Sequence, residues 1–314
     1  MDKIDIAEMT LNNSLAIKRS ERVLIICDEK TMEIAQSFYK AALKICMEPM
    51  LIEIREGKHH GDEPPRIAAG AMLDSDVIIA PTTHSLTYTN AARSALRKGA
   101  RIVTMPGITM EMLLSGGLEA DYNQISRNIR KFAKTVQKAR TLRIRSEEGT
   151  DISMSIEGRD WITDDNGLCH KRGFITNLPA GEVFIAPKEN SANGRVVIDG
   201  VFVESSIGRI VLEIKDGIVK RFSGPPEVKD LMMRGVCQRT LSEVGIGMNP
   251  MAKIIWNILE DQKKLGTVHI GFGDNSTFGG NVTCDLHYDG VILHPTLTIG
   301  KKKIIENGNF IMEL

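Results

Sequence analysis

The first half of the chain alternates short apolar runs with helical segments, and this alternation limits the folds open to it. Segments with helical periodicity, such as 30–46 and 85–100, follow runs rich in Val, Ile and Leu. Short apolar strands separated by helices are typical of a parallel sheet covered on both faces. We therefore expect residues 1–142 to form a doubly wound α/β domain. The predicted strands are 22–28, 49–55, 76–81 and 101–106.

The pattern changes after residue 142. Alternating apolar and polar residues are interrupted by short Gly-containing turns, such as Lys-Asp-Gly at 215–217, which indicate hairpins. Two helices are expected here, one over 226–239 and one from the Asn249-Pro250 cap to about Lys264. Residues 143–314 are thus predicted to form a mainly antiparallel α+β domain. A basic helix over 121–143 is expected to close the first domain with a solvated face.

Composition excludes several classes of function. Forty basic residues balance forty acidic ones, so no overall field favours nucleic acid or an anionic membrane. No apolar run approaches the roughly 20 residues needed to span a bilayer, and the N-terminus lacks a signal-peptide core. The five cysteines are scattered and form no Cys-x-x-Cys, which favours reduced thiols over disulfides or a cysteine zinc site. We expect a cytoplasmic protein.

The segment 267–295 contains a candidate metal site. His287 and Asp289 lie two residues apart in an apolar, β-branched context, so on a strand they would point to the same face. His269, in an earlier strand-like run, is a candidate third ligand. Two histidines and one carboxylate form the ligand set of many open catalytic metal sites. A hydrogen-bonded core histidine is the alternative interpretation for each of the two histidines.

Two glutamates lie in similar surroundings. Glu182 and Glu243 are single carboxylates among apolar and small residues, where an unpaired charge is costly. A bound cation would offset that cost. A buried salt bridge or a helix cap is the alternative for each residue.

Four further positions, His84, Thr89, Ser276 and Asp285, are candidates for contact with substrate or with a ligand. His84 and Thr89 follow the third predicted strand, and ligands of open parallel sheets bind beyond the carboxyl ends of the strands. The alternative is that His84 is a loop histidine that caps the next helix. Asp285 is two residues before His287, so it is expected to share its face and orient it. The glycine-rich turn at 272–281 is expected to line the pocket.

Four ordered blocks resemble the motifs of the aminopeptidase T family of metallo-aminopeptidases, which are leucyl aminopeptidase-like enzymes. The blocks are NLPAGEVFIAP, LSEVGIGMNP, LGTVHIGFG and DLHYDGVILHP, and a fifth similarity lies at THSLTYTNAARSALRKGARI. The resemblance implies that Glu182 and Glu243 bind metal, with Glu243 bridging metals or handling the catalytic water. It implies that His269, His287 and Asp289 complete the ligand set, and that the protein is a homodimer.

The chain departs from this family at one functional position. The aminopeptidases have a tyrosine seven residues after the histidine that His269 resembles, and here that residue is Ser276. The departure is shared with a sister branch, the dioxygenases that act on 2,5-dihydroxypyridine. In that branch the resemblance implies a single non-haem Fe(II) held by His269, His287 and Asp289.

Two functions follow from the resemblance. The first is a metal-dependent hydrolase, an aminopeptidase that releases N-terminal amino acids from short peptides through a metal-activated water. It would use one or two divalent ions (Zn, Co or Mn), with Glu243 or Glu182 moving the proton. The alternative is an Fe(II) ring-cleaving dioxygenase with a small-molecule substrate. Neither function involves a nucleic-acid or membrane partner.

Overall fold

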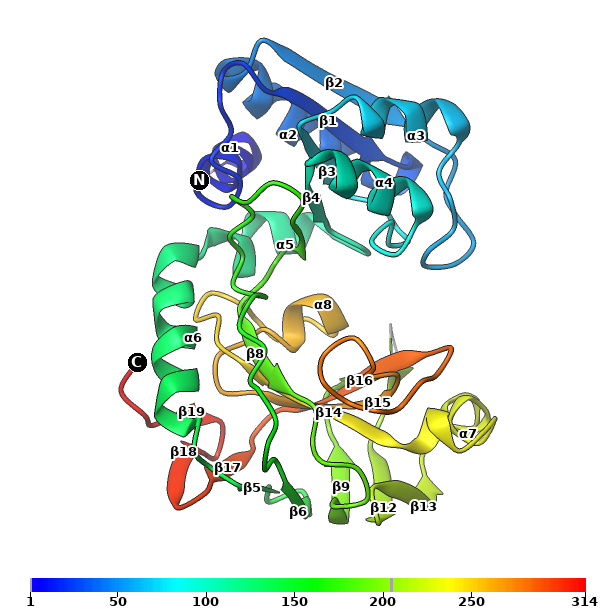
Figure 1. Ribbon diagram of the computed structural model, residues 1–314, viewed down its shortest axis with the longest axis vertical. Helices are drawn as coiled ribbons and strands as arrows, with labels where there is room; N and C mark the ends of the chain where they lie inside the picture. Colours follow the sequence, from blue (N-terminus) through cyan, green and yellow to red (C-terminus); the bar gives the residue numbers. More distant parts are fainter. Residues whose placement is uncertain (1, 204–205) are drawn as a thin grey trace. The chain divides into compact units, whose positions relative to one another are not determined.

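The computed structural model describes residues 2–203 and 206–314, which form two compact units. Unit 1 consists of residues 1–126 and 167–180, and unit 2 of residues 127–166 and 181–314. Each unit is described by itself below, with the element labels of Figure 1.

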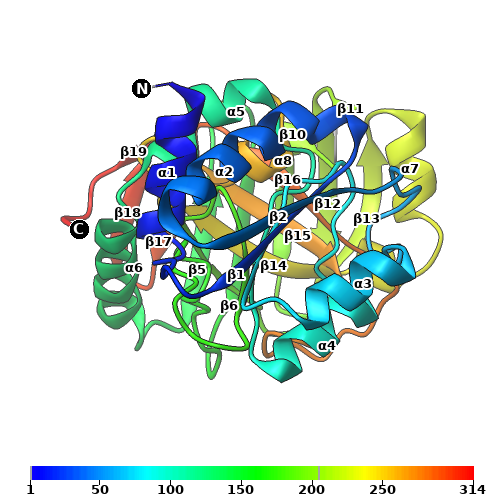
Figure 2. The same ribbon diagram turned by 90° about the horizontal axis from the view of Figure 1, so that it is seen from above.

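Unit 1 contains a parallel sheet with the strand order β2-β1-β3-β4-β7 (Figure 1). Helices α3 and α4 lie on one side of β1, and α1 and α2 lie on the other (Figure 2). Both faces are therefore covered, which explains why the inner strands β1, β3 and β4 are buried along nearly their whole length. The strands are β1 (Arg22–Cys27), β2 (Glu48–Glu53), β3 (Val77–Ala80), β4 (Arg101–Thr104) and β7 (Ile175–Asn177). The helices are α1 (Lys3–Asn13), η1 (Glu29–Thr31), α2 (Met32–Ile45), α3 (Arg66–Leu73), α4 (Asn90–Lys98), α5 (Met110–Leu114) and η2 (Gly117–Glu119).

Strand β7 was not expected from the sequence. It is three residues long and pairs in parallel with β4, where Ile175 is the register partner of Ile102. The chain therefore returns to unit 1 after leaving it, and the units do not follow the single boundary expected at residue 142. A three-residue strand is too short to show a hydrophobic period, so sequence reasoning could not identify this return.

Unit 2 is built from two antiparallel sheets (Figure 1). The six-stranded sheet has the order β11-β10-β16-β15-β14-β8, and the eight-stranded sheet has the order β13-β12-β9-β6-β5-β17-β18-β19. The first contains β8 (Glu182–Ile185), β10 (Val201–Phe202), β11 (Ser206–Ile207), β14 (Leu241–Gly247), β15 (Val268–Gly273) and β16 (His287–Ile292). The second contains β5 (Thr141–Arg145), β6 (Asp151–Ser155), β9 (Asn193–Ile198), β12 (Ile210–Lys215), β13 (Ile218–Ser223), β17 (Thr296–Ile299), β18 (Lys302–Glu306) and β19 (Asn309–Phe310).

The two sheets of unit 2 approach each other closely at Gly290. A Cβ atom on this residue of β16 would come within 2.4 Å of Ile198 in β9 and 2.5 Å of Phe202 in β10. All residues of the neighbouring strands β14 and β15 are buried. The central strands of the six-stranded sheet are therefore rigidly enclosed, which suits them to hold side chains in fixed positions.

The helices of unit 2 are shorter than predicted. They are α6 (Tyr122–Val136), which begins in unit 1, α7 (Pro226–Met232), η3 (Cys237–Arg239) and α8 (Ile258–Asp261). The helix predicted from Asn249 to Lys264 is wrong apart from α8. The Glu260 and Asp261 carboxylates accept hydrogen bonds from the backbone N–H groups of Lys253 and Ile255. Such side-chain bonds compete with helical ones, and here they stabilise an irregular segment.

The expectation of reduced thiols is also wrong at two positions. Cys237 and Cys284 form a disulfide that closes a 47-residue separation. The other three cysteines, Cys27, Cys46 and Cys169, are buried thiols. The sequence carried no spacing signal for this bond, because it joins two residues that only the fold of unit 2 brings together. No described helix is long and apolar enough to cross a membrane.

Candidate metal centre

The five predicted ligands lie on four adjacent strands of unit 2. Glu182 begins β8, Glu243 lies in β14, and His269 lies in β15. His287 and Asp289 lie in β16, two residues apart. The strands pair in the order β8-β14-β15-β16 (Figure 1), so these side chains come from one part of one sheet.

Glycines lie opposite every one of these side chains across the strand pairs. Gly245 is the register partner of His269, and its added Cβ would meet the imidazole Nε2 at 1.9 Å. Gly271 lies between two candidate ligands, and its Cβ would come within 2.6 Å of the Glu243 Cβ and 2.8 Å of Asp289 Oδ1. The sheet therefore provides a cradle that a β-carbon would fill. The remaining pairs are Gly247 with Glu182 and Gly273 with His287.

Glu243 lies at the centre of the cluster. Its Oε1 lies 3.2 Å from Nε2 of His269, and its Oε2 lies 3.4 Å from Nε2 of His287. His287 Nε2 also lies 3.3 Å from Asp289 Oδ1, and His269 Nε2 lies 3.5 Å from Glu182 Oε2. Glu243, His287 and Asp289 each offer a ligand atom within 4.8 Å of the others. The side chains converge on one another rather than on the surrounding core.

The unsatisfied atoms of the cluster fit a cation. Glu182 Oε2 and Asp289 Oδ1 are buried and make no hydrogen bond in the described part of the chain. A buried carboxylate oxygen without a donor costs free energy, and a divalent ion would remove that cost. Two imidazoles and three carboxylates, with no thiolate among them, suit Fe, Mn, Co or Zn. The residues present therefore fit a divalent metal ion.

Electrostatics in the metal-free cluster favour protonated imidazoles. Burial would lower the pKa of His287, but the Asp289 and Glu243 carboxylates outweigh burial and raise the pKa to about 10. Burial likewise opposes protonation of His269, and the carboxylates of Glu182 and Glu243 raise its pKa overall. The charge of His287 in turn holds the pKa of Asp289 below its usual range, against the effect of burial. The carboxylates thus attract positive charge at both histidines.

A buried ion-pair network adjoins Glu182. Lys263 Nζ lies 2.5 Å from Glu182 Oε1 and 2.6 Å from Asp165 Oδ2. Burial would lower the pKa of Lys263, and the two carboxylates more than offset it, so the pKa is raised and the ammonium stays charged. Burial raises the pKa of Asp165 to about 7, although Lys263 acts in the opposite direction. The salt bridge expected as an alternative for Glu182 therefore coexists with its place in the cluster.

Backbone and aromatic contacts fix the His287 ring. Its Nδ1 lies 2.7 Å from the carbonyl oxygen of Asp274, which leaves Nε2 directed at the carboxylates. Phe278, from the glycine-rich turn, packs edge-on against the imidazole, with ring centroids 5.7 Å apart. It also packs edge-on against Phe184, with ring centroids 5.3 Å apart. A backbone carbonyl that accepts from the distal ring nitrogen of a histidine sets its tautomer for metal binding.

Two predicted contacts have other partners in unit 2. Asp285 Oδ1 accepts a hydrogen bond from Gln238 Nε2 at 2.7 Å, so the orienting role expected of Asp285 falls to the Asp274 carbonyl. Asp285 precedes the start of β16, so the strand parity used for the prediction does not extend to it. Ser276 is exposed, and its hydroxyl donates to the Asp274 carboxylate.

The two candidates in unit 1 have local roles there. Thr89 is fully buried and caps α4, because its Oγ1 accepts from Ala92 N and donates to the Leu86 carbonyl. Thr89 therefore has a structural role, and its contact with substrate stays a prediction. His84 packs edge-on against His60, and its Nε2 lies 4.0 Å from Glu56 Oε1.

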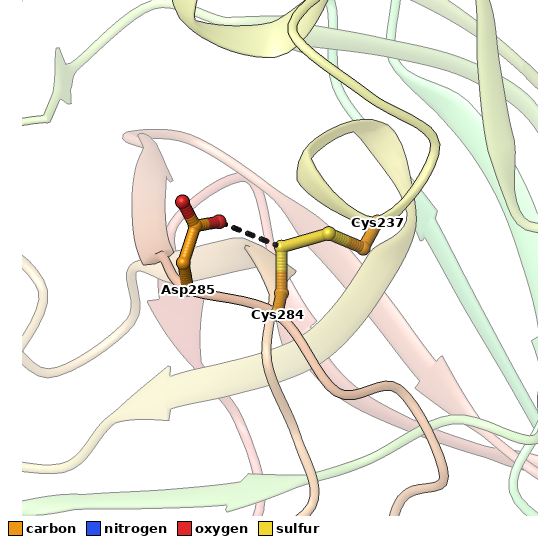
Figure 3. A group of neighbouring side chains, drawn as sticks. All are labelled: Cys237, Cys284 and Asp285. Atoms are coloured by element: carbon orange, nitrogen blue, oxygen red, sulfur yellow. Dashed lines mark hydrogen bonds between the residues drawn. A yellow bond between two sulfur atoms is a disulfide. The ribbon is translucent and has the colours of Figure 1, made fainter.

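A second group of potential ligands does not suit a metal. Cys237, Cys284 and Asp285 lie together in unit 2, and Figure 3 shows the bond between the two sulfur atoms beside the carboxylate. A metal-binding cysteine must be a thiolate, and neither sulfur is one while the disulfide persists. We therefore assign this group to structure.

Sequence reasoning missed Lys263, Asp165 and the glycine cradle. The glycines had a usable signal in the sequence. A candidate ligand is followed by glycine at every second residue in two places, Glu-x-Gly-x-Gly at 243–247 and His-x-Gly-x-Gly at 269–273. Residues at this spacing share a strand face, so each motif places its glycines beside its ligand. Lys263 had no such sequence signal, because a Lys-Lys pair at the end of an expected helix is typical of a solvated face.

Comparison with known proteins identifies relatives along the whole chain. The family model for 2,5-dihydroxypyridine 5,6-dioxygenase matches residues 4–312. A 2,5-dihydroxypyridine 5,6-dioxygenase from Pseudomonas putida is 24% identical over 266 residues, which cover 78% of this chain and 73% of that protein.

Two solved structures share the fold. The 2,5-dihydroxypyridine dioxygenase of Pseudomonas putida KT2440 has a TM-score of 0.75 and 19% identity, covering 99% of this chain and 97% of that one. Wild-type AmpT from Thermus thermophilus has a TM-score of 0.72 and 16% identity, covering 99% of both chains. The resemblance to the aminopeptidase T family is thus supported as a common fold. Because the family model matches nearly the entire sequence, the chain belongs to the 2,5-dihydroxypyridine 5,6-dioxygenase family of enzymes.

Proposed function

We propose that this protein is a non-haem Fe(II) dioxygenase that cleaves the ring of 2,5-dihydroxypyridine or a close analogue. The observation that carries the proposal is the family match over residues 4–312, which includes all five candidate ligands. This reverses the order of the two functions expected from the sequence, where the hydrolase came first.

His269, His287 and Asp289 would hold the iron in this proposal. Two histidines and a carboxylate form the facial triad of many non-haem iron oxygenases and leave positions open for substrate and oxygen. Bound iron would supply the one-electron chemistry that lets dioxygen react with the ring. The overall reaction breaks one ring bond and adds both atoms of dioxygen to the substrate.

The remaining side chains would bind the substrate and move its proton. Glu182 and Glu243 are buried carboxylates beside the histidines, so either can accept a proton from a substrate hydroxyl. Phe184 and Phe278 form an edge-on pair next to His287 and offer apolar surface to a flat aromatic ring. Residue 276 is an exposed serine. It therefore lacks the phenol that the aminopeptidases have at this position, which disfavours peptide hydrolysis.

A metallo-aminopeptidase remains the second candidate, on one observation. The two oxygens of Glu243 face different histidines, 3.2 Å and 3.4 Å away, as a carboxylate that bridges two metal ions would. In this second function Glu243, His269 and His287 would be among the residues that hold the metal, and the metal would supply an activated water.

Two parallel assays separate these functions. Protein loaded anaerobically with Fe(II) is mixed with 2,5-dihydroxypyridine and oxygen, and protein loaded with Zn, Co or Mn is mixed with aminoacyl anilides. We expect loss of pyridine absorbance with oxygen uptake in the first assay and no anilide release in the second. Anilide release without oxygen uptake would replace the proposal with the hydrolase.

The homodimer and the cytoplasmic location stay predictions. Light scattering of the purified protein tests whether it is a homodimer.

A further inference from the structure

Lys263 is a buried cation at the edge of the candidate metal centre. Its side chain is 1% exposed, and its ammonium contacts the carboxylates of Glu182 and Asp165 at 2.5 and 2.6 Å. Its carbonyl accepts a hydrogen bond from Asn249 N at 2.8 Å, which anchors the backbone at the same point. A lysine is rarely buried unless paired, so this position has a specific requirement for positive charge.

Glu182 is shared between Lys263 and the ligand cluster. Its Oε1 contacts the ammonium, whereas its Oε2 is buried, makes no hydrogen bond within the described residues and lies 3.5 Å from His269 Nε2. A metal ion that used Glu182 as a full ligand would have to share this carboxylate with the ammonium. Two cations held by one carboxylate in a buried site repel each other strongly, because water does not screen them.

Among the described residues, no lysine or arginine forms an ion pair at the opposite end of the cluster. Glu243, His287 and Asp289 offer ligand atoms within 4.8 Å of one another. Within the described chain, the ion pairs of these three residues involve only each other and His269. The cluster therefore has one end suited to a metal ion and one end already supplied with positive charge.

We propose that Lys263 takes the place of a second metal ion, so that the centre binds one divalent ion and Glu182 stays a positioned carboxylate. This inference rests on the proposed function only in requiring that the cluster bind a metal, and it disfavours the two-ion arrangement of the aminopeptidase. It makes Lys263 a positioning residue that acts through Glu182.

Metal stoichiometry tests the inference without any measurement of activity. The metal-free full-length chain is titrated with Co(II) in a calorimeter, and bound cobalt is counted after gel filtration. We expect one Co(II) per chain for the wild type and two for Lys263→Met. Lys264→Met makes the same change one residue later and should keep the value of one. Lys263→Arg retains the charge and should also keep one.

The outcomes separate this inference from the proposed function. Two Co(II) in the wild type, or one in a Lys263→Met protein with a native circular dichroism spectrum, would overturn the inference alone. No binding by the wild type would overturn the metal centre and the inference with it. If Lys263→Met does not fold, Asp165→Asn combined with Lys263→Met removes both buried charges, and this variant should bind two ions. One ion in that variant would contradict the proposal.

Discussion

His269 lies directly opposite Gly245 across the β14–β15 pair, and a β-carbon at residue 245 would come within 1.9 Å of its Nε2. This nitrogen is the atom that faces Glu243 and Glu182. The position of a candidate ligand therefore depends on the absence of a side chain on the neighbouring strand. Sheets that hold ligands on adjacent strands need such gaps, because their side chains are only about 5 Å apart.

Gly245→Ala should displace His269 and weaken metal binding. We expect Co(II) affinity to fall at least tenfold, since a shifted ligand no longer meets the ion, as calorimetric titration would show. Gly70→Ala is a matched control, because nothing lies within 4 Å of a Cβ at this helical position. Equal affinities for Gly245→Ala and the wild type would mean that His269 is not a ligand.

Metal affinity should rise with pH between about 6.5 and 8.5. The pKa of His287 is raised to about 10 in the metal-free protein, so its imidazole is protonated throughout this range. A metal ion needs the neutral ring, so binding releases a proton and becomes more favourable as pH increases, by up to tenfold per unit for each proton released. Titrations of Co(II) in buffers of different ionisation enthalpy measure that release. Binding that is independent of pH, with no proton released, would contradict the electrostatics of the cluster.

Much of unit 1 could be predicted, because each of its four longer strands contains a short apolar run and helices lie between them. The five candidate ligands could also be selected, since each is a polar residue in a strand-like context or a family motif. The helix expected after Asn249 fails because buried carboxylates of Glu260 and Asp261 bind the backbone of that segment. Lys263 escaped prediction because its partner Asp165 is 98 residues away, and only the fold brings the two together.

The Cys237–Cys284 bond predicts a thiol count. The unfolded protein should show three thiols without reductant and five after reduction, since three described cysteines are unpaired. Closing a loop of this length should contribute about 2–4 kcal/mol to the free energy of unfolding in urea. Cys237→Ser and the reduced wild type should then have equal stability, and five thiols without reductant would exclude the bond.

Thr89→Ala should affect stability and spare the metal centre. The Thr89 side chain caps α4, so its loss should cost about 0.5–2 kcal/mol of unfolding free energy in urea. Metal affinity should not change, because all candidate ligands lie in unit 2. A large loss of turnover at unchanged stability would instead assign Thr89 to substrate binding.

The most direct test of the account is the iron content of the wild type and of His287→Ala after anaerobic loading with Fe(II) and gel filtration. The account predicts about one iron per wild-type chain and almost none in the variant, with both proteins giving the same circular dichroism spectrum. Equal iron in the two proteins, or none in the wild type, would contradict a metal centre on this face of the sheet.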